Sequence, residues 1–243
     1  MTAILGGLPA ILDDEPALAS VLGRRSASLA VAEPARAMVL AALVRRAWRL
    51  PLIVVVPTGL EAERLANDLR LYLGDSAVES FPAWETLPFE RVSPGVETMG
   101  RRLRVLHRLG DLGDPPAVVV ASGRALVQRL GPGAGRTPPQ RIGPGALVDQ
   151  TDLVADLVAT RYRREDQVEH RGEIAVRGSI VDVWPSTADA PVRIDLWGDE
   201  VERLTEFGVA DQRATVHRAE VEIYPCRELI PDQEVQELSL IHI

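Results

Sequence analysis

The chain has 243 residues, of which 46% are hydrophobic, and its 27 basic and 35 acidic residues give a formal net charge of −8. This acidic balance argues against a free-standing nucleic-acid binder, because such proteins are usually basic. Every basic residue is an arginine. The absence of lysine excludes Schiff-base chemistry, a catalytic lysine and the lysine of a Walker A phosphate loop.

Cysteine, histidine and hydropathy exclude further classes of protein. The single cysteine, Cys226, rules out an intramolecular disulfide and any multi-cysteine zinc site. The four histidines match no metal-binding spacing, and no convergent acid–base set is visible, so we expect no catalytic, metal-binding or cofactor-binding residues in this chain. The longest apolar run, residues 50–56, is far below the ~20 residues of a membrane span. We therefore expect a cytoplasmic protein with no membrane partner.

Residues 1–123 alternate short apolar runs with amphipathic segments. Strands are predicted at residues 28–31, 52–56, 78–81 and 117–121, with 52–56 buried on both faces. Helices are predicted after Asp13 or Asp14, from Pro34 to Trp48, after the T-x-x-E capping box at Thr58 and up to Gly74, after Ser93, and after Ser122. Alternating strands and helices predict a parallel, doubly wound α/β sheet.

The first strand–loop–helix unit stands where a P-loop ATPase would hold phosphate. Here the loop, residues 32–37, reads AEPARA and contains no glycine. Pro34 has no N–H to offer an oxygen, and Glu33 would repel phosphate, so Arg36 is the only favourable charge. We therefore predict a degenerate P-loop-NTPase-like lobe that does not bind ATP.

Two features follow in the region of residues 81–110. Trp84 and Phe89 lie in the proline-rich loop of residues 81–94 and are expected to pack that loop onto the first lobe and not to stack on DNA bases. The helix after it carries a basic stripe, which is typical of a solvated helix face: Arg101, Arg102, Arg104 and Arg108. A residual DNA contact in this helix, within residues 94–110, stays open.

A second, smaller α+β domain is predicted from residue 124 to about 213. Residues 131–145 are rich in glycine and proline and are predicted to be a boundary loop. Asp149 or Thr151 is predicted to cap a helix that runs through Thr160. Residues 192–196 alternate as a strand, residues 198–199 form a hairpin turn, and residues 201–207 return as the next strand.

The stretch from Arg161 to Trp184, RYRREDQVEHRGEIAVRGSIVDVW, combines charge with strand-like alternation. Arg177 is predicted on the strand face opposite Ile174 and Val176, beside a bend at Gly178. An arginine on a rigid strand offers a planar, bidentate fork to a carboxylate of a partner. One alternative interpretation is an ordinary solvated strand face. Another is that nearby acidic residues neutralise Arg163 and Arg177 within the chain: Glu165, Asp166, Glu169 and Glu173.

Three segments carry a resemblance to a known family: PAWETLPFE followed by SPGVET, YRREDQVEHRGEIAVRGSIVDVWP, and PVRIDLWGDEVERLTEF followed by DQRA. Over roughly residues 28–235 the chain resembles the N-terminal region of the bacterial transcription-repair coupling factor, the Mfd family. This region is similar to the excision-repair protein UvrB. UvrB itself carries a working P-loop and a long aromatic hairpin, where this chain has AEPARA and the short PAWETLPFE loop.

The resemblance implies an assignment of parts and of binding residues. Residues 1–123 correspond to a degenerate ATPase-like lobe, 124–213 to an inserted UvrA-binding domain, and 214–237 to the start of the return to the first lobe. It places UvrA contacts at Arg163 and Arg177, with Ile180 and Val181 as the adjacent apolar contact. Arg161 stands where the family often has glycine.

The resemblance also implies what the parent protein does. That protein is an ATP-dependent DNA translocase that displaces stalled RNA polymerase and recruits nucleotide excision repair. Its ATP, Mg, RNA polymerase and double-stranded DNA would bind to domains beyond this chain. The alternatives are a fragment of UvrB itself or a small-molecule enzyme on a doubly wound sheet. Residues 238–243, LSLIHI, resemble a translated sequencing adapter and are interpreted as an artefact.

Overall fold

The computed structural model describes residues 4–229, with the exception of 88, 89, 91, 112 and 132. The chain divides into two compact units. The first contains residues 1–83 and 108–129, and the second contains 84–107 and 130–243. The residues interpreted as an adapter artefact lie outside the described part of the chain, as does Phe89.

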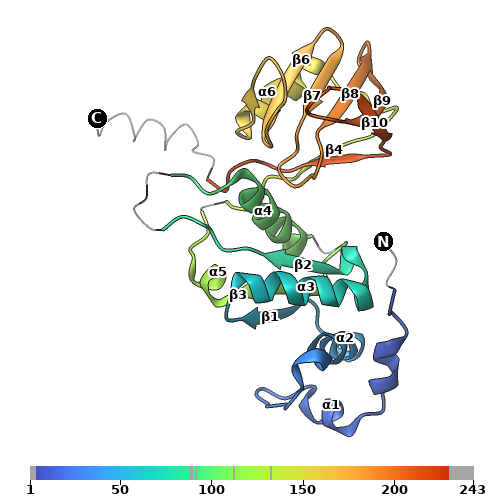
Figure 1. Cartoon of the computed structure of the whole chain (residues 1–243), viewed down its shortest axis with the longest axis vertical. Coiled ribbons are helices and arrows are strands. Elements are labelled where there is room, and N and C mark those ends of the chain that lie inside the picture. The colour runs from blue at the N-terminus through green and yellow to red at the C-terminus, as the bar shows by residue number, and fades with distance from the viewer. Residues whose placement is uncertain (1–3, 88–89, 91, 112, 132, 230–243) are drawn as a thin grey trace. The chain divides into compact units, whose positions relative to one another are not determined.

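The first unit is built on a three-stranded parallel sheet of order β1-β3-β2 (Figure 1). Its strands are β1 (Leu52–Val56), β2 (Val78–Phe81) and β3 (Val118–Ser122). Helices α2 (Arg36–Arg46) and α3 (Gly59–Leu73) bury small residues such as Ala41 and Ala66 against it. The predicted mixed α/β architecture with a parallel sheet is thus confirmed.

The prediction that residues 52–56 are buried on both faces was wrong. Among the residues that the structure describes, β1 pairs only with β3 and is an edge strand, and its burial alternates along the strand. Leu52, Val54 and Val56 pack on the helical layer, whereas Ile53 and Val55 are exposed. A continuous apolar run therefore did not signal a strand covered on both sides.

Three predicted helix boundaries in the first unit are confirmed. Thr58 accepts a hydrogen bond from the backbone N–H of Glu61 and begins α3. Gly74 ends that helix with a φ of 88°, a conformation that glycine adopts without a Cβ clash. Ser122 accepts from the N–H of Ala125 and begins α5 (Gly123–Val127).

The N-terminal segment differs from the prediction. It contains two 3₁₀ turns, η1 (Leu8–Leu12) and η2 (Glu33–Ala35), and the helix α1 (Pro16–Val21). Glu15, and not an aspartate, caps α1 by accepting from the N–H of Ala17. Residues 28–31 form no strand. Trp48 lies beyond the end of α2 and is exposed, so it does not join that helix's apolar face.

The helix α4 (Val96–Gly110) corrects the interpretation of its basic stripe as a solvated face. Arg102 is completely buried and forms an ion pair with Glu228, which is also buried. Arg108 pairs with the buried carboxylate of Glu79 at 2.9 Å. Arginines at helical spacing were used here for internal pairing. Trp84 belongs to the second unit, so the prediction that it packs on the first lobe was wrong. The Arg102 guanidinium lies 5.4 Å from the Trp84 ring, and the Trp84 indole N–H donates to Glu228 at 3.3 Å.

The second unit is built on a six-stranded sheet of order β10-β9-β8-β7-β6-β5 (Figure 1). The strands are β5 (Arg163–Arg164), β6 (Glu173–Arg177), β7 (Ile180–Val183), β8 (Val192–Trp197), β9 (Glu200–Phe207) and β10 (Ala214–His217). β5 runs parallel to β6, and the other neighbours are antiparallel. The register of β10 on β9 shifts between residues 214 and 217.

The larger core of this unit lies on one side of the six-stranded sheet, and a smaller buried cluster of Val168, Ala175 and Phe207 lies on the other side. Ile174, Val181 and Ile194 contribute their side chains to the larger core because alternate residues of a strand face the same side. Helix α6 (Gln150–Ala159), capped by Asp149, adds Leu153 and Leu157 to the same cluster. The predicted helix and the predicted hairpin at residues 198–199 are both present.

One element inside the predicted boundary loop was missed. Residues 140–142 form β4 (Gln140–Ile142), which pairs with β11 (Val221–Ile223) in a separate two-stranded sheet. Ile142 and Ile223 of this pair join the core cluster of the second unit. The sequence-based limits of the domains, at residues 123, 213 and 237, stay predictions.

Candidate protein-interaction site

The side of the six-stranded sheet opposite the core carries a row of arginines, which we call the arginine face. Its members are Arg163, Arg177, Arg193 and Arg203, on strands β5, β6, β8 and β9. Each forms an ion pair with a carboxylate that projects from the same face of the sheet. On this face the arginine side chains bind carboxylates that are largely buried, next to the small buried cluster that contains Ala175 and Phe207.

Arg163 holds one of these carboxylates at the edge of the sheet. It is paired in register with Glu173, and its Nη2 donates to Glu173 Oε1 at 2.9 Å. The Arg163 side chain is 66% exposed, whereas that of Glu173 is only 6% exposed. Glu173 Oε2 also accepts from the backbone N–H groups of Glu169 and His170 at 2.9 and 2.8 Å. The Arg163 guanidinium is therefore exposed to solvent while Glu173 holds it in place.

The pKa of Glu173 reflects this arrangement. Burial by itself raises the pKa, but the two backbone hydrogen bonds and the charges of His170 and Arg163 together outweigh burial, so the pKa lies below its usual value of 4.5. The ionised carboxylate is the form that the fold stabilises.

Arg177 takes part in a larger cluster. Its Nη2 donates to Asp182 Oδ2 at 2.5 Å and to Gln212 Oε1 at 3.3 Å. Arg193 binds the same carboxylate through two N–H groups, at 2.7 and 2.9 Å. Asp182 is completely buried, and the hydrogen bond to Asp182 raises the pKa of Arg193 further above its usual value, against the effect of burial. One buried charge is shared by two arginines, so the cluster keeps a positive excess.

The predicted binding residues are partly brought together by the fold. Arg163 and Arg177 share the arginine face, but Arg163 on β5 lies beside Glu173 at the start of β6, whereas Arg177 ends β6, four residues or about 13 Å further along that strand. Ile180 is paired directly with Arg177 and is half-buried on the same face. Val181 alternates to the other side and is completely buried in the core. Val181 therefore supports the surface from below, and the expectation of a direct contact through it is corrected.

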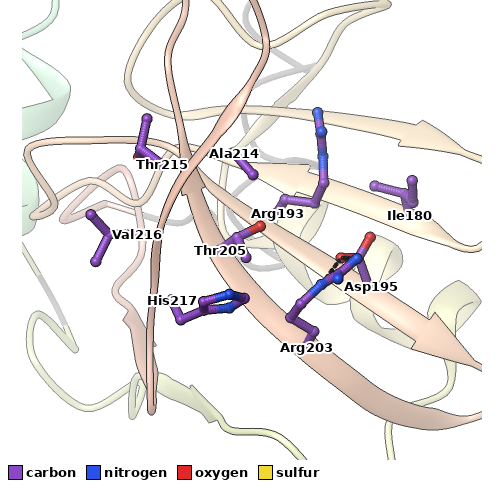
Figure 2. Close-up of a pocket in the computed structure, with 9 residues that line it drawn as sticks. All are labelled: Ile180, Arg193, Asp195, Arg203, Thr205, Ala214, Thr215, Val216 and His217. Carbon is purple, nitrogen blue, oxygen red and sulfur yellow. Dashed lines mark hydrogen bonds and ion pairs between the residues drawn. The ribbon is translucent and has the colours of Figure 1, made fainter.

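Sequence reasoning missed a third pair and the pocket beside it (Figure 2). Arg203 donates through Nε to Asp195 at 2.9 Å, and its side chain is 54% exposed. β10 walls a pocket of about 370 Å³ next to this pair, in which Ile180 and Arg193 also take part. The signal was present in the alternation of residues 193, 195 and 203, but only the register of β8 on β9 brings them together.

Sequence reasoning also missed two apolar side chains. Trp197 is 80% exposed at the end of β8, and Leu147 is similarly exposed. Glu200 is paired with Trp197 of β8 on one edge of its strand and with Leu147 on the other edge. Directly paired residues of neighbouring strands project to the same face, so Trp197 and Leu147 flank Glu200 on one side of the sheet. Trp197 is two residues beyond Asp195 and so shares the arginine face.

The first unit has a smaller pocket at the AEPARA turn, where a P-loop ATPase would hold phosphate. It has a volume of about 180 Å³ and lies at the end of β1, where Val56, Pro34 and Arg36 line it. A second arginine, Arg64, also lines it, and three acidic side chains bring the formal charge of the lining to −1: Glu33, Glu61 and Asp68. An acidic lining disfavours a phosphate chain.

Within residues 4–229, apart from the five left out, no group of three or more histidine, cysteine, aspartate or glutamate residues is arranged to hold a metal ion. In the same part of the chain, no helix is both long enough and apolar enough to cross a membrane.

Comparison with known proteins identifies the family. A family model described as "UvrB interaction domain" matches residues 141–229, which include the whole arginine face. The transcription-repair-coupling factor of Mycobacterium bovis is 43% identical over 226 residues, covering 88% of this chain. The chain belongs to the transcription-repair-coupling factor family. The relatives from Myxococcus xanthus and Escherichia coli are 34% and 28% identical over 88% and 77% of the chain.

The chain spans less than a fifth of the length of these relatives. The match covers only 18% of the length of the M. bovis and M. xanthus coupling factors and 16% of that from E. coli. The chain thus corresponds to one module of these long proteins. The names of the relatives favour a coupling factor over a fragment of UvrB. The match to the UvrB interaction domain accounts for the resemblance of this chain to UvrB.

Proposed function

We propose that the arginine face is the surface through which this module recruits UvrA to excision repair, with Arg163, Arg177 and Ile180 in the contact and Val181 supporting it from the core. The observation that carries the proposal is the setting of Arg177. The Arg177 guanidinium is held by an ion pair with the completely buried Asp182, yet the Arg177 side chain is 45% exposed. The match to the UvrB interaction domain supports a partner from the same repair pathway.

The geometry favours an acidic protein partner. Because Asp182 is already bound by Arg193 through two hydrogen bonds, Arg177 retains N–H groups and charge for a second carboxylate. A guanidinium that is held in place loses little conformational freedom on binding. Ile180 beside it offers apolar surface, and interface hot spots commonly combine an arginine with such surroundings.

Calorimetry of the chain against UvrA tests this assignment. Truncating an arginine that meets a buried partner carboxylate costs about 2–5 kcal/mol, so Arg177→Ala is expected to weaken binding about thirtyfold or more. Arg177→Lys is expected to fail as well, because lysine lacks the planar fork. Arg164→Ala is the matched control, since this neighbour of Arg163 in β5 alternates to the other side. Equal losses in the control and in Arg177→Ala would refute a specific site.

We further propose that the first unit is an ATPase-like lobe whose nucleotide site has been lost, so that this chain is not itself an enzyme and needs no cofactor. The AEPARA turn and the acidic pocket beside it support this. Calorimetry with Mg-ATP is expected to give no saturable heat up to millimolar nucleotide. A micromolar dissociation constant would refute the proposal.

The remaining activities are proposed for the parent protein. By resemblance it is an ATP-driven DNA translocase of the cytoplasm that acts on stalled RNA polymerase. ATP, Mg, RNA polymerase and double-stranded DNA would then bind to its other domains. Assayed alone, the present chain should not displace a stalled polymerase.

A further inference from the structure

A buried hydroxyl faces the pocket on the arginine face. Thr205, on β9, is only 4% exposed, and its Oγ1 has no hydrogen-bond partner among the residues that the structure describes. In Figure 2 this oxygen points toward the space framed by Arg193, Asp195 and His217. Buried hydroxyls are normally hydrogen-bonded, because leaving one unsatisfied costs free energy. The pocket therefore offers a donor or acceptor that the chain itself does not use.

Other polar groups around the pocket are mostly donors. Arg203 uses Nε and Nη2 on a single oxygen of Asp195, and its remaining guanidinium N–H groups stay at the exposed end of the side chain. His217 is exposed on the β10 wall. Three arginines, Arg177, Arg193 and Arg203, stand against two aspartates, which leaves this part of the face with a charge of +1. An anion that only accepts hydrogen bonds complements such a site.

We propose that this pocket receives the carboxylate side chain of an acidic residue of the protein that binds the arginine face. Thr205 Oγ1 donates to the carboxylate, and Arg203 supplies charge from the rim. Ile180 and Val216 form apolar walls for the methylene stem of the incoming side chain. The inference rests on the proposed function, since the same partner is involved, and it adds a second anchoring point beyond Arg177.

The test measures affinity for UvrA and thermal stability in parallel. Thr205→Val replaces the hydroxyl by a methyl group of similar shape, so the pocket is kept while the donor is removed. Loss of a hydrogen bond to a charged group is expected to weaken binding about tenfold or more. Because the unsatisfied hydroxyl disappears, the melting temperature should not fall. Thr151→Val, on α6 at the core side of the sheet, is the matched control and should leave the affinity unchanged.

A second variant covers the case in which Thr205→Val does not fold. Arg203→Gln removes the rim charge at an exposed position and is expected to weaken binding about threefold or more at low salt, with a smaller effect at high salt. If wild type binds UvrA and Arg177→Ala weakens binding while Thr205→Val and Arg203→Gln bind like wild type, the pocket inference is overturned and the proposed function stands. If wild type does not bind UvrA, both are overturned.

Discussion

Two sets of arginines look alike in the sequence and differ in the structure. On α4, Arg102 and its partner Glu228 are both buried, so that the charges neutralise each other inside the fold. In the pair of Arg177 with Asp182 on the arginine face only the carboxylate is buried: Asp182 is inaccessible, whereas Arg177 reaches solvent. A buried pair of the first kind stabilises the fold and cannot bind a partner, because neither side chain is accessible. A pair of the second kind holds the arginine in place and leaves part of its guanidinium exposed to a partner.

The comparison predicts the largest loss of stability at Arg102. Arg102→Leu would leave Glu228 buried without its counter-charge, which typically costs about 3–5 kcal/mol in the free energy of unfolding. Urea denaturation measures this change. Arg101→Leu, one residue away with a 4.0 Å surface pair to Glu97, is the control and should cost less than about 1 kcal/mol. Adding Glu228→Leu to Arg102→Leu should recover part of the loss, and a cost below about 1 kcal/mol for Arg102→Leu alone would contradict the comparison.

Within the arginine face, substitution of Arg193 should lower the free energy of unfolding more than substitution of Arg177. Arg193 is mostly buried, makes two hydrogen bonds to Asp182 and lies 4.9 Å over the ring of Phe207. Arg193→Leu is expected to cost about 2–3 kcal/mol of unfolding free energy. Arg177→Ala should cost under about 1 kcal/mol, because Arg193 still neutralises Asp182. Chemical denaturation of the two variants decides the order, and a larger cost at Arg177 would show that its role is structural.

A smaller effect is expected from acid at Glu173. Its pKa is lowered in the fold, so below about pH 4.5 the unfolded chain binds the proton more readily, and the stabilisation is lost as the pH falls through the lowered pKa. Glu173→Gln cannot titrate. Its unfolding free energy should therefore depend less on pH than that of wild type between about pH 5 and pH 3. Parallel pH dependences for the two proteins, measured by denaturation, would show that Glu173 does not contribute.

The smallest effect is expected in a thiol-labelling experiment on Arg177→Ala. Burial raises the pKa of Cys226 to about 12, so the thiol should react with iodoacetamide only when the second unit opens. Arg177→Ala should label at close to the wild-type rate at pH 8. Arg102→Leu, in contrast, should label faster by roughly a hundredfold for a loss of 3 kcal/mol. Rapid labelling of folded wild type would contradict the burial of this thiol.

Much of the local structure could be predicted because it depends on neighbouring residues. The cap at Thr58, the end at Gly74 and the hairpin at residues 198–199 involve residues only a few positions apart. The exposure of β1 could not be predicted, since it depends on the strand order. The pairing of Arg102 with Glu228, 126 positions away, is equally invisible to helical periodicity.

The candidate site divides in the same way. Alternation placed Arg177 on one side of β6 and Gly178 in the following turn, and the resemblance supplied Arg163. Alternation also places Val181 in the core, next to Ile180 on the opposite side, but the sequence alone did not say which side is covered. The pocket with Thr205 needs three strands in register, together with the β10 wall, and no short motif encodes it.

The edges of the six-stranded sheet limit how a partner can be recognised. At one edge β5 has only two residues, and at the other the four residues of β10 pair with a register shift. Short or irregular edges expose few free backbone groups and do not template an added strand. A partner that docked by β-strand addition would need such a template. Recognition by this sheet should therefore depend on side chains that stand upright on its face, so that single substitutions can retune the choice of partner while the main chain stays unchanged.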